Sequence, residues 1–80
     1  MEKELDYKEI GRRIKEIRHL KNMTQAELAE LIDIYDNSHI SRIEAGVKGI
    51  SLKSVAKIAC VLNVSLDFLV FGSTTDTRSN

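Results

Sequence analysis

The sequence predicts an all-α fold, a compact domain of five short helices. Apolar residues recur at the three- and four-residue spacing of amphipathic helices, and capping residues precede most of these stretches. Proline is absent from the 80 residues, and no sustained apolar–polar alternation marks a strand. This length supports one hydrophobic core and not two. We therefore expect a single domain over residues 1–72 and a disordered polar tail over residues 73–80.

The first helix is expected over residues 7–21. Asp6 and Glu9 have the spacing of an N-terminal cap with a reciprocal acid. Lys21 suits the negative end of the helix, and Asn22 favours a left-handed exit from it. The apolar stripe of this helix consists of Ile10, Ile14, Ile17 and Leu20.

A second helix is expected over residues 25–32. Thr24 and Glu27 have the spacing of a capping box, and Met23 before the cap can pack against Leu28. The apolar face of this helix consists of Leu28, Ala29, Leu31 and Ile32.

The third helix is expected over residues 37–45, and Gly46 ends it. Ile40 and Ile43 are its strong apolar positions, and the other side chains carry amide, hydroxyl, imidazole and guanidinium groups. A helix with two buried residues and a hydrogen-bonding face lies on the surface of a domain rather than inside it.

The last two helices are expected over residues 52–62 and 66–71. Ser51 and Ser65 are their N-caps, and Gly72 follows the last turn. The stripe of the longer helix consists of Leu52, Val55, Ile58, Ala59 and Leu62.

Composition and motifs exclude several classes of protein. No apolar run approaches the ~18 residues of a membrane-spanning helix, and residues 1–10 lack the apolar segment of a signal peptide. We therefore expect a cytoplasmic protein without a membrane partner. Cys60 is a single cysteine and is expected to be a small core or interface residue. His19 and His39 lie far apart without a metal-binding or phosphate-loop motif, so we expect no metal, no cofactor and no enzyme.

Charge is balanced overall and segregated along the chain. Twelve bases match twelve acids, which by itself argues against a nucleic-acid partner. Residues 8–21 hold six bases and two acids, residues 24–36 hold four acids and no base, and residues 42–57 hold four bases and one acid. Solvated helix faces produce the same pattern, so charge alone does not decide the function.

The second and third helices together have the form of a helix-turn-helix. A short capped helix, a tight connection and a helix with an exposed polar face match that motif. Four stretches then carry a resemblance: IGRRIKEIR at 10–18, TQAELA at 24–29, ISRIEAG at 40–46 and VSLDFL at 64–69. In this order they resemble the Cro/XRE family of lambda-repressor-like DNA-binding domains.

The resemblance implies a five-helix domain, a homodimer, a double-stranded DNA operator and a recognition helix, Asn37–Ala45, in the major groove. By position it implies base contacts by Asn37, Ser38, Ser41 and Arg42. Arg42 suits the O6 and N7 acceptors of guanine, and Asn37 suits the edge of adenine. The candidates for contacts to the DNA backbone are Thr24, Gln25, Tyr35, His39, Lys48 and Lys53.

Two further roles concern the domain itself. The resemblance implies that Arg18 and Glu44 form an internal ion pair, and that Gln25 also supports the recognition helix. A core this small cannot hold every apolar side chain near the end of the chain, so we expect a dimer surface there. Its candidate residues are Val61, Phe68, Val70 and Phe71.

The sequence departs from the family pattern at two places. The spacing from Gln25 to Glu44 is one residue longer than usual, and we place the extra residue in the turn near Tyr35. Ile50 stands where proline is frequent.

Several functions within and outside this class stay open. The chain fits a repressor of a phage or mobile element, a restriction–modification controller, and an antitoxin-type regulator. From a different class, it fits a protein-interaction module that no longer binds DNA, which the zero net charge and the acidic second helix favour. No small-molecule ligand is indicated.

Overall fold

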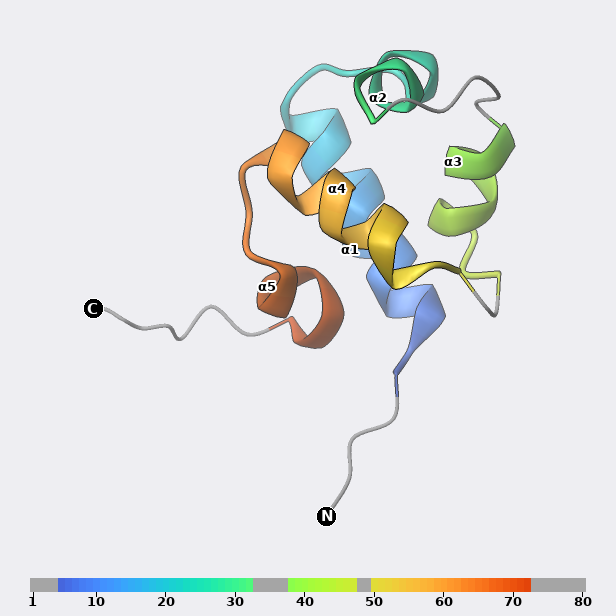
Figure 1. Cartoon of the computed structure of the whole chain (residues 1–80), viewed down its shortest axis with the longest axis vertical. Coiled ribbons are helices and arrows are strands. Elements are labelled where there is room, and N and C mark those ends of the chain that lie inside the picture. The colour runs from blue at the N-terminus through green and yellow to red at the C-terminus, as the bar shows by residue number, and fades with distance from the viewer. Residues whose placement is uncertain (1–4, 33–37, 48–49, 73–80) are drawn as a thin grey trace, which may run out of the picture.

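In the described part of the chain, four other helices are arranged around α1 (Tyr7–Leu20), which runs through the middle of the molecule (Figure 1). The computed structural model describes residues 5–32, 38–47 and 50–72. The other helices are α2 (Gln25–Leu31), α3 (Ser38–Glu44), α4 (Leu52–Leu62) and α5 (Leu66–Phe71). The described part of the chain contains no strand, which confirms the predicted five-helix, all-α class.

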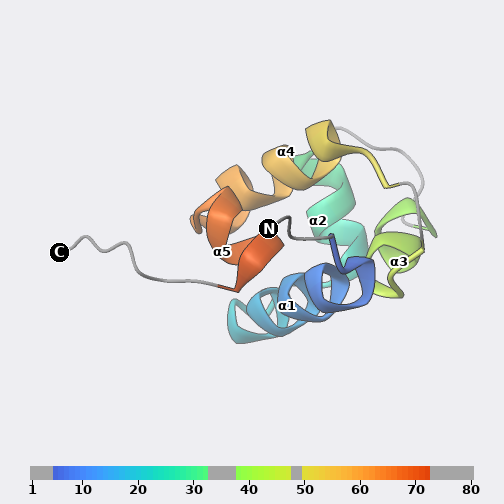
Figure 2. The same cartoon turned by 90° about the horizontal axis from the view of Figure 1, so that it is seen from below.

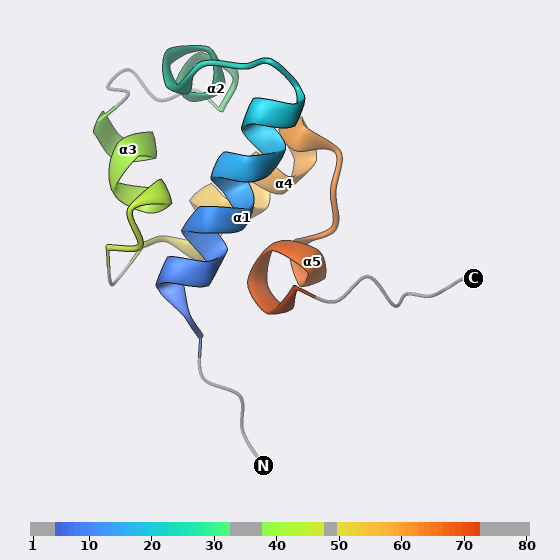
Figure 3. The ribbon, with the colours of Figure 1, turned by 180° about the vertical axis from the view of Figure 1, so that it is seen from behind.

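The arrangement of the helices separates α3 from α5. In two views from opposite sides, α3 and α5 flank α1 on different sides, and α2 covers one end of α1 (Figures 1 and 3). The view from below shows the same separation, with α4 across the core from α1 (Figure 2). Both α3 and α5 contact α1. α1 therefore lies between α3 and α5 and contacts both of them.

Local capping explains where the helices begin. The amide of Glu27 donates to Thr24 Oγ1 at 3.0 Å and the amide of Thr24 donates to Glu27 Oε1 at 2.8 Å, which confirms the capping box. The amide of Glu9 donates to Asp6 Oδ1 at 3.2 Å, as expected. The prediction of a reciprocal hydrogen bond, in which the Glu9 carboxylate accepts from the Asp6 amide, was wrong, because this carboxylate accepts from the Arg12 guanidinium instead.

Left-handed residues end four of the helices. Asn22 (φ 55°), Gly46 (φ 81°), Asn63 (φ 61°) and Gly72 (φ 74°) follow α1, α3, α4 and α5. After α3, the amide of Val47 donates to the Arg42 carbonyl oxygen at 3.1 Å, the long-range bond of a Schellman motif. The exits expected at Asn22 and Gly46 are thus confirmed.

Every helix contributes to one core. Its buried apolar residues are Ile10, Ile14, Leu28, Ala29, Ile32, Ile40, Ile43, Val55, Ile58, Ala59, Leu62 and Leu69. Three residues assigned to the apolar stripes are wrong: Leu20, Leu31 and Leu52 are 78%, 58% and 64% exposed. Each is the first or last residue of its helix, where the chain turns away from the core.

Cys60 was expected in the core or at an interface; its side chain is exposed, so it is not a core residue, and the interface role stays a prediction. Within the described residues, none of the helices combines the length and the apolar character needed to cross a membrane.

Candidate nucleic-acid interface

α3 has one face in the core and one face in solvent. Ile40 and Ile43 are fully buried, whereas Ser38, Ser41 and Arg42 are exposed. Within the part of the chain that the structure describes, no hydrogen bond or ion pair engages the Arg42 guanidinium. The short polar groups and the guanidinium predicted to contact bases therefore lie at the surface.

Three of the predicted site residues, Asn37, Tyr35 and Lys48, lie outside the described residues. The same holds for the turn in which we placed the extra residue.

The predicted backbone-contacting residues that the structure describes lie on three different elements. Thr24 is the exposed N-cap of α2, and Gln25 is the partly buried first residue of that helix. Lys53 is exposed in the first turn of α4. His39 lies on α3, where its Nε2 is 3.3 Å from Ser54 Oγ. This contact joins α3 to the first turn of α4, the turn in which Lys53 also lies.

A buried ion pair ties α3 to α1. Arg18 Nε donates to Glu44 Oε2 at 2.6 Å, and Arg18 Nη2 donates to Glu44 Oε1 at 3.0 Å. The side chains are 7% and 3% exposed. A bidentate pair fixes both partners in direction as well as distance. The last residue of α3 therefore has a fixed position relative to α1.

Two more hydrogen bonds extend this cluster to α2 and to the segment before it. Gln25 Nε2 donates to Glu44 Oε1 at 3.0 Å, and Arg18 Nη1 donates to the Met23 carbonyl oxygen at 2.7 Å. No buried side-chain nitrogen or oxygen in the described residues lacks a hydrogen-bond partner. The cluster thus joins α1, the start of α2 and the end of α3, and it leaves neither charge unpaired.

α1 and α3 also approach each other through their backbones at Gly11. A Cβ atom at this position would lie 2.5 Å from the Glu44 carbonyl oxygen and closer still to that of Ile43. Only a residue without a side chain permits this approach. The sequence contains Gly11 in the middle of a helix, where glycine is unfavourable, and this was the available signal for the close contact.

The apolar residues assigned to a dimer surface lie on α4 and α5. Val61, Phe68 and Val70 are partly buried and pack against the edge of the core. Phe71, the last residue of α5, is 44% exposed. α5, which carries Phe68, Val70 and Phe71, lies on the side of α1 away from α3, and α4, which carries Val61, lies behind α1 (Figure 3).

Within the described ranges, no group of three or more histidine, cysteine, aspartate or glutamate side chains is placed to hold a metal ion. The exposed side chain of His19 lies beside the ion pair, with its Nε2 3.1 Å from Arg18 Nη2. Sequence reasoning did not anticipate this contact or the one between His39 and Ser54.

Comparison with known proteins agrees with the helical arrangement. The family model described as helix-turn-helix matches residues 14–69, which is most of the chain. A search of curated proteins found no match.

Solved structures share both fold and sequence with this chain. The restriction-modification controller protein C.AhdI from Aeromonas hydrophila is 31% identical with a TM-score of 0.73, over 80% of this chain and 96% of that chain. SinR, a master regulator for biofilm formation from Bacillus subtilis, solved in complex with DNA, is 36% identical with a TM-score of 0.68, over 75% and 95%. The P22 c2 repressor, solved with a synthetic operator, is 25% identical with a TM-score of 0.73, over 80% and 96%.

Proposed function

The chain belongs to the Cro/XRE-type helix-turn-helix family of DNA-binding transcription regulators, and we propose that it binds a near-palindromic DNA operator as a homodimer. The recognition helix, α3 with the residues that flank it, lies in the major groove. The exposed polar face of α3 is the observation that carries this proposal.

The chemistry of that face suits the edges of base pairs. The Arg42 guanidinium offers two parallel N–H groups, which match the O6 and N7 acceptors of guanine. Ser38 and Ser41 carry hydroxyl groups that can donate to or accept from base edges. Because Ile40 and Ile43 fix the other side of the helix in the core, these groups enter the groove on a preset surface.

Phosphate contacts set the position of α3 in the groove. The Gln25 amide has two N–H groups, and one of them donates to Glu44. The second is available for a DNA phosphate, so one side chain supports α3 and grips the backbone. Lys53 adds an exposed cation in the first turn of α4, the turn whose Ser54 contacts His39 of α3. Such contacts release counterions, so affinity falls with salt by about one logarithmic unit of slope per phosphate contact.

A homodimer presents two recognition helices to the DNA instead of one. The dimer surface of one copy meets the same surface of a second copy around a two-fold axis, and it consists of Val61, Phe68, Val70 and Phe71. Two recognition helices about 34–36 Å apart then read half-sites one helical turn apart on the same side of the duplex. Occupation of such an operator beside a promoter blocks or recruits the polymerase. We place this activity in the cytoplasm.

Selection of bound duplexes from a random pool tests the proposal. At low ionic strength we expect enrichment of an inverted repeat whose half-sites lie about 10 base pairs apart. The Arg42→Ala variant, selected in parallel, controls for enrichment that does not depend on α3. Retention of no duplex of any sequence would contradict the proposal and favour the protein-interaction module.

A further inference from the structure

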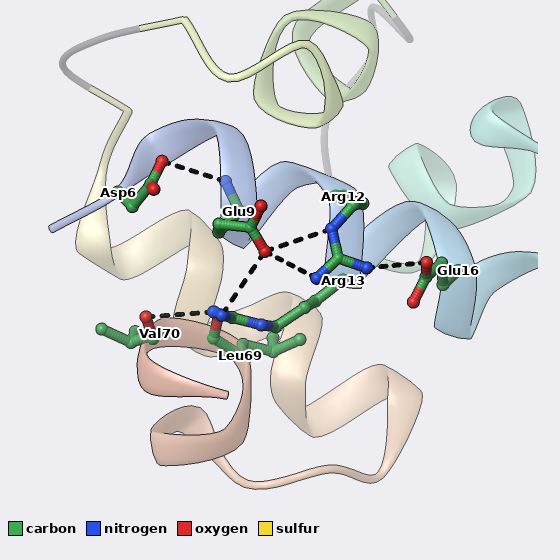
Figure 4. Close-up of polar contacts among 7 residues, drawn as sticks. All are labelled: Asp6, Glu9, Arg12, Arg13, Glu16, Leu69 and Val70. Carbon is green, nitrogen blue, oxygen red and sulfur yellow. Dashed lines mark hydrogen bonds and ion pairs between the residues drawn. The ribbon is translucent and has the colours of Figure 1, made fainter. Parts of the chain in front are cut away.

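The guanidinium of Arg13 reaches from α1 to the C-terminal end of α5 (Figure 4). Its Nη1 donates to the carbonyl oxygens of Leu69 at 2.9 Å and of Val70 at 3.2 Å. Its Nη2 lies 3.7 Å from Glu9 Oε1, and the side chain is 16% exposed. Arg13 is thus a partly buried link between two helices far apart in the sequence.

α5 depends on this link because it is only six residues long. A helix this short is not stable by itself, and the carbonyl groups of its last turn have no partner within the helix. The amide of Gly72 donates to the Phe68 carbonyl oxygen at 2.8 Å. Arg13 takes the next two carbonyl groups, and Ser65 caps the other end of the helix. The guanidinium therefore completes the C-terminal cap of α5 from outside.

Gly72 makes room for this cap. Its φ of 74° lies in the left-handed region, and a Cβ atom there would lie 2.6 Å from Arg13 Nη2. A side chain at this position would be strained and would also displace the guanidinium. The residue after α5 and the arginine on α1 are therefore matched to each other.

The capped turn carries part of the proposed dimer surface. Val70 and Phe71 lie in it, and the carbonyl group of Val70 is one of those that Arg13 binds. On its other side, α1 holds α3 through Arg18 and Glu44. The distance between the two recognition helices in a dimer thus depends on how α5 is fixed to α1.

We propose that Arg13 is a positioning residue for dimerisation: by capping the last turn of α5 it sets the direction in which Val70 and Phe71 meet a second copy. This inference rests on the proposed homodimer. Glu9 helps to hold Arg13 in this position, because the Glu9 carboxylate lies between the guanidinium groups of Arg12 and Arg13 (Figure 4).

The neighbouring arginine provides a matched control. Arg12 lies on the same helix, binds Glu9 and Glu16 of that helix, and has a side chain that is 52% exposed. Arg12→Met and Arg13→Met remove the same charge and shorten the side chain equally. They differ in whether the cap of α5 is lost.

The experiment measures the monomer–dimer dissociation constant of the whole chain by sedimentation equilibrium, together with affinity for a duplex that holds one half-site. We expect Arg13→Met to weaken dimerisation by about tenfold, because hydrogen bonds from a charged donor to the α5 carbonyls are lost. Arg12→Met leaves the constant within about twofold of wild type. Half-site affinity stays within about twofold for both variants, because α3 keeps its clamp to α1.

Each other outcome overturns the proposal in a recognisable way. If the wild-type chain is monomeric throughout, the homodimer itself is wrong and this inference falls with it. If the wild type dimerises and Arg13→Met does so equally well, only the role of Arg13 is wrong. If dimerisation and half-site affinity fall in parallel, Arg13 acts on stability in general.

Arg13→Lys keeps the test decisive if Arg13→Met does not fold. Lysine retains the stem and the charge but replaces the planar fork with a single ammonium group. We expect it to weaken dimerisation by about threefold. A constant equal to that of the wild type in this variant overturns the proposal.

Discussion

Arg18 and Glu44 form a buried, bidentate ion pair that joins α1 to the last residue of α3. Gln25 donates to the same carboxylate, so the position of α3 depends on side chains from two other helices. Buried pairs contribute little net stability compared with apolar packing, but they are costly to break. In this protein the pair of Arg18 and Glu44 holds the polar face of α3 in a fixed position.

Loss of the Glu44 carboxylate should therefore destabilise the fold strongly. Glu44→Ala leaves the Arg18 guanidinium buried without its counter-charge, which costs about 3–5 kcal/mol. Thermal and urea unfolding followed by circular dichroism measures the loss. Glu30→Ala, which removes an exposed acid of α2, should stay within about 0.5 kcal/mol of wild type. Equal losses in the two variants would contradict the structural role of the pair.

Gly11→Ala tests the backbone approach between α1 and α3. Alanine favours a helix over glycine by about 1 kcal/mol, so an open site would be stabilised. Here the new methyl group meets the carbonyl oxygens of Ile43 and Glu44, and such overpacking costs about 1–3 kcal/mol or more. Because both obstacles are backbone atoms, the overlap decides the sign and we expect destabilisation in urea unfolding. A more stable variant would show that the helices can separate freely.

The start signals of the helices were predictable because they are local. Thr24 and Glu27 are three residues apart, and the structure shows both hydrogen bonds of their capping box. The exposed Leu20, Leu31 and Leu52 were assigned wrongly, since helical periodicity identifies a face but not the turn at which that face leaves the core. Contacts between residues far apart in the sequence are harder still to predict, because no local sequence pattern marks them.

Some features of the candidate site were likewise predictable from the sequence, and others were not. The exposure of Ser41 and Arg42 follows from the spacing of Ile40 and Ile43, which a sequence reveals. The partners of Arg13 are backbone carbonyl groups, which every residue has, so no side-chain pattern indicates them. Arg18 and Glu44 are 26 residues apart, and only the family resemblance suggested that they meet.

Acid should weaken the fold partly through Glu9. The hydrogen bond from Arg12, with the charges of Arg12 and Arg13, holds the pKa of Glu9 below its ordinary value. A carboxyl group with a lowered folded-state pKa contributes stability above its unfolded pKa and loses it as the pH falls through the folded value. We therefore expect the urea midpoint to fall with acid less steeply in Glu9→Gln than in wild type. The difference should shrink at high salt, because the group is exposed. If the urea midpoints of the two proteins fall equally as the pH is lowered, Glu9 makes no such contribution.

Arg42→Ala separates base reading from phosphate binding. Loss of a bidentate contact to guanine should cost about 1–3 kcal/mol and relax the preference at one position of each half-site. Lys53→Ala should instead weaken binding to all sequences alike and lower the salt slope by about one unit. Fluorescence anisotropy with the selected operator and its single-base variants distinguishes the two. An unchanged base preference in Arg42→Ala would place the recognition surface elsewhere.

Phe71→Glu should convert the proposed dimer into a monomer. Phe71 ends α5, the helix on the side of α1 away from α3 (Figure 3), and it is 44% exposed, so a charge there can be solvated in the monomer. In a dimer the same charges face each other across the two-fold axis in an apolar surface, where burial of an unpaired carboxylate is unfavourable. Sedimentation at micromolar concentration measures the change, and half-site affinity should stay near that of wild type. Leu31→Glu, an exposed apolar residue of α2, is the matched control and should leave the mass unchanged. If Phe71→Glu stays dimeric, the copies meet through another surface, and α5 has no part in setting the spacing of the operator half-sites.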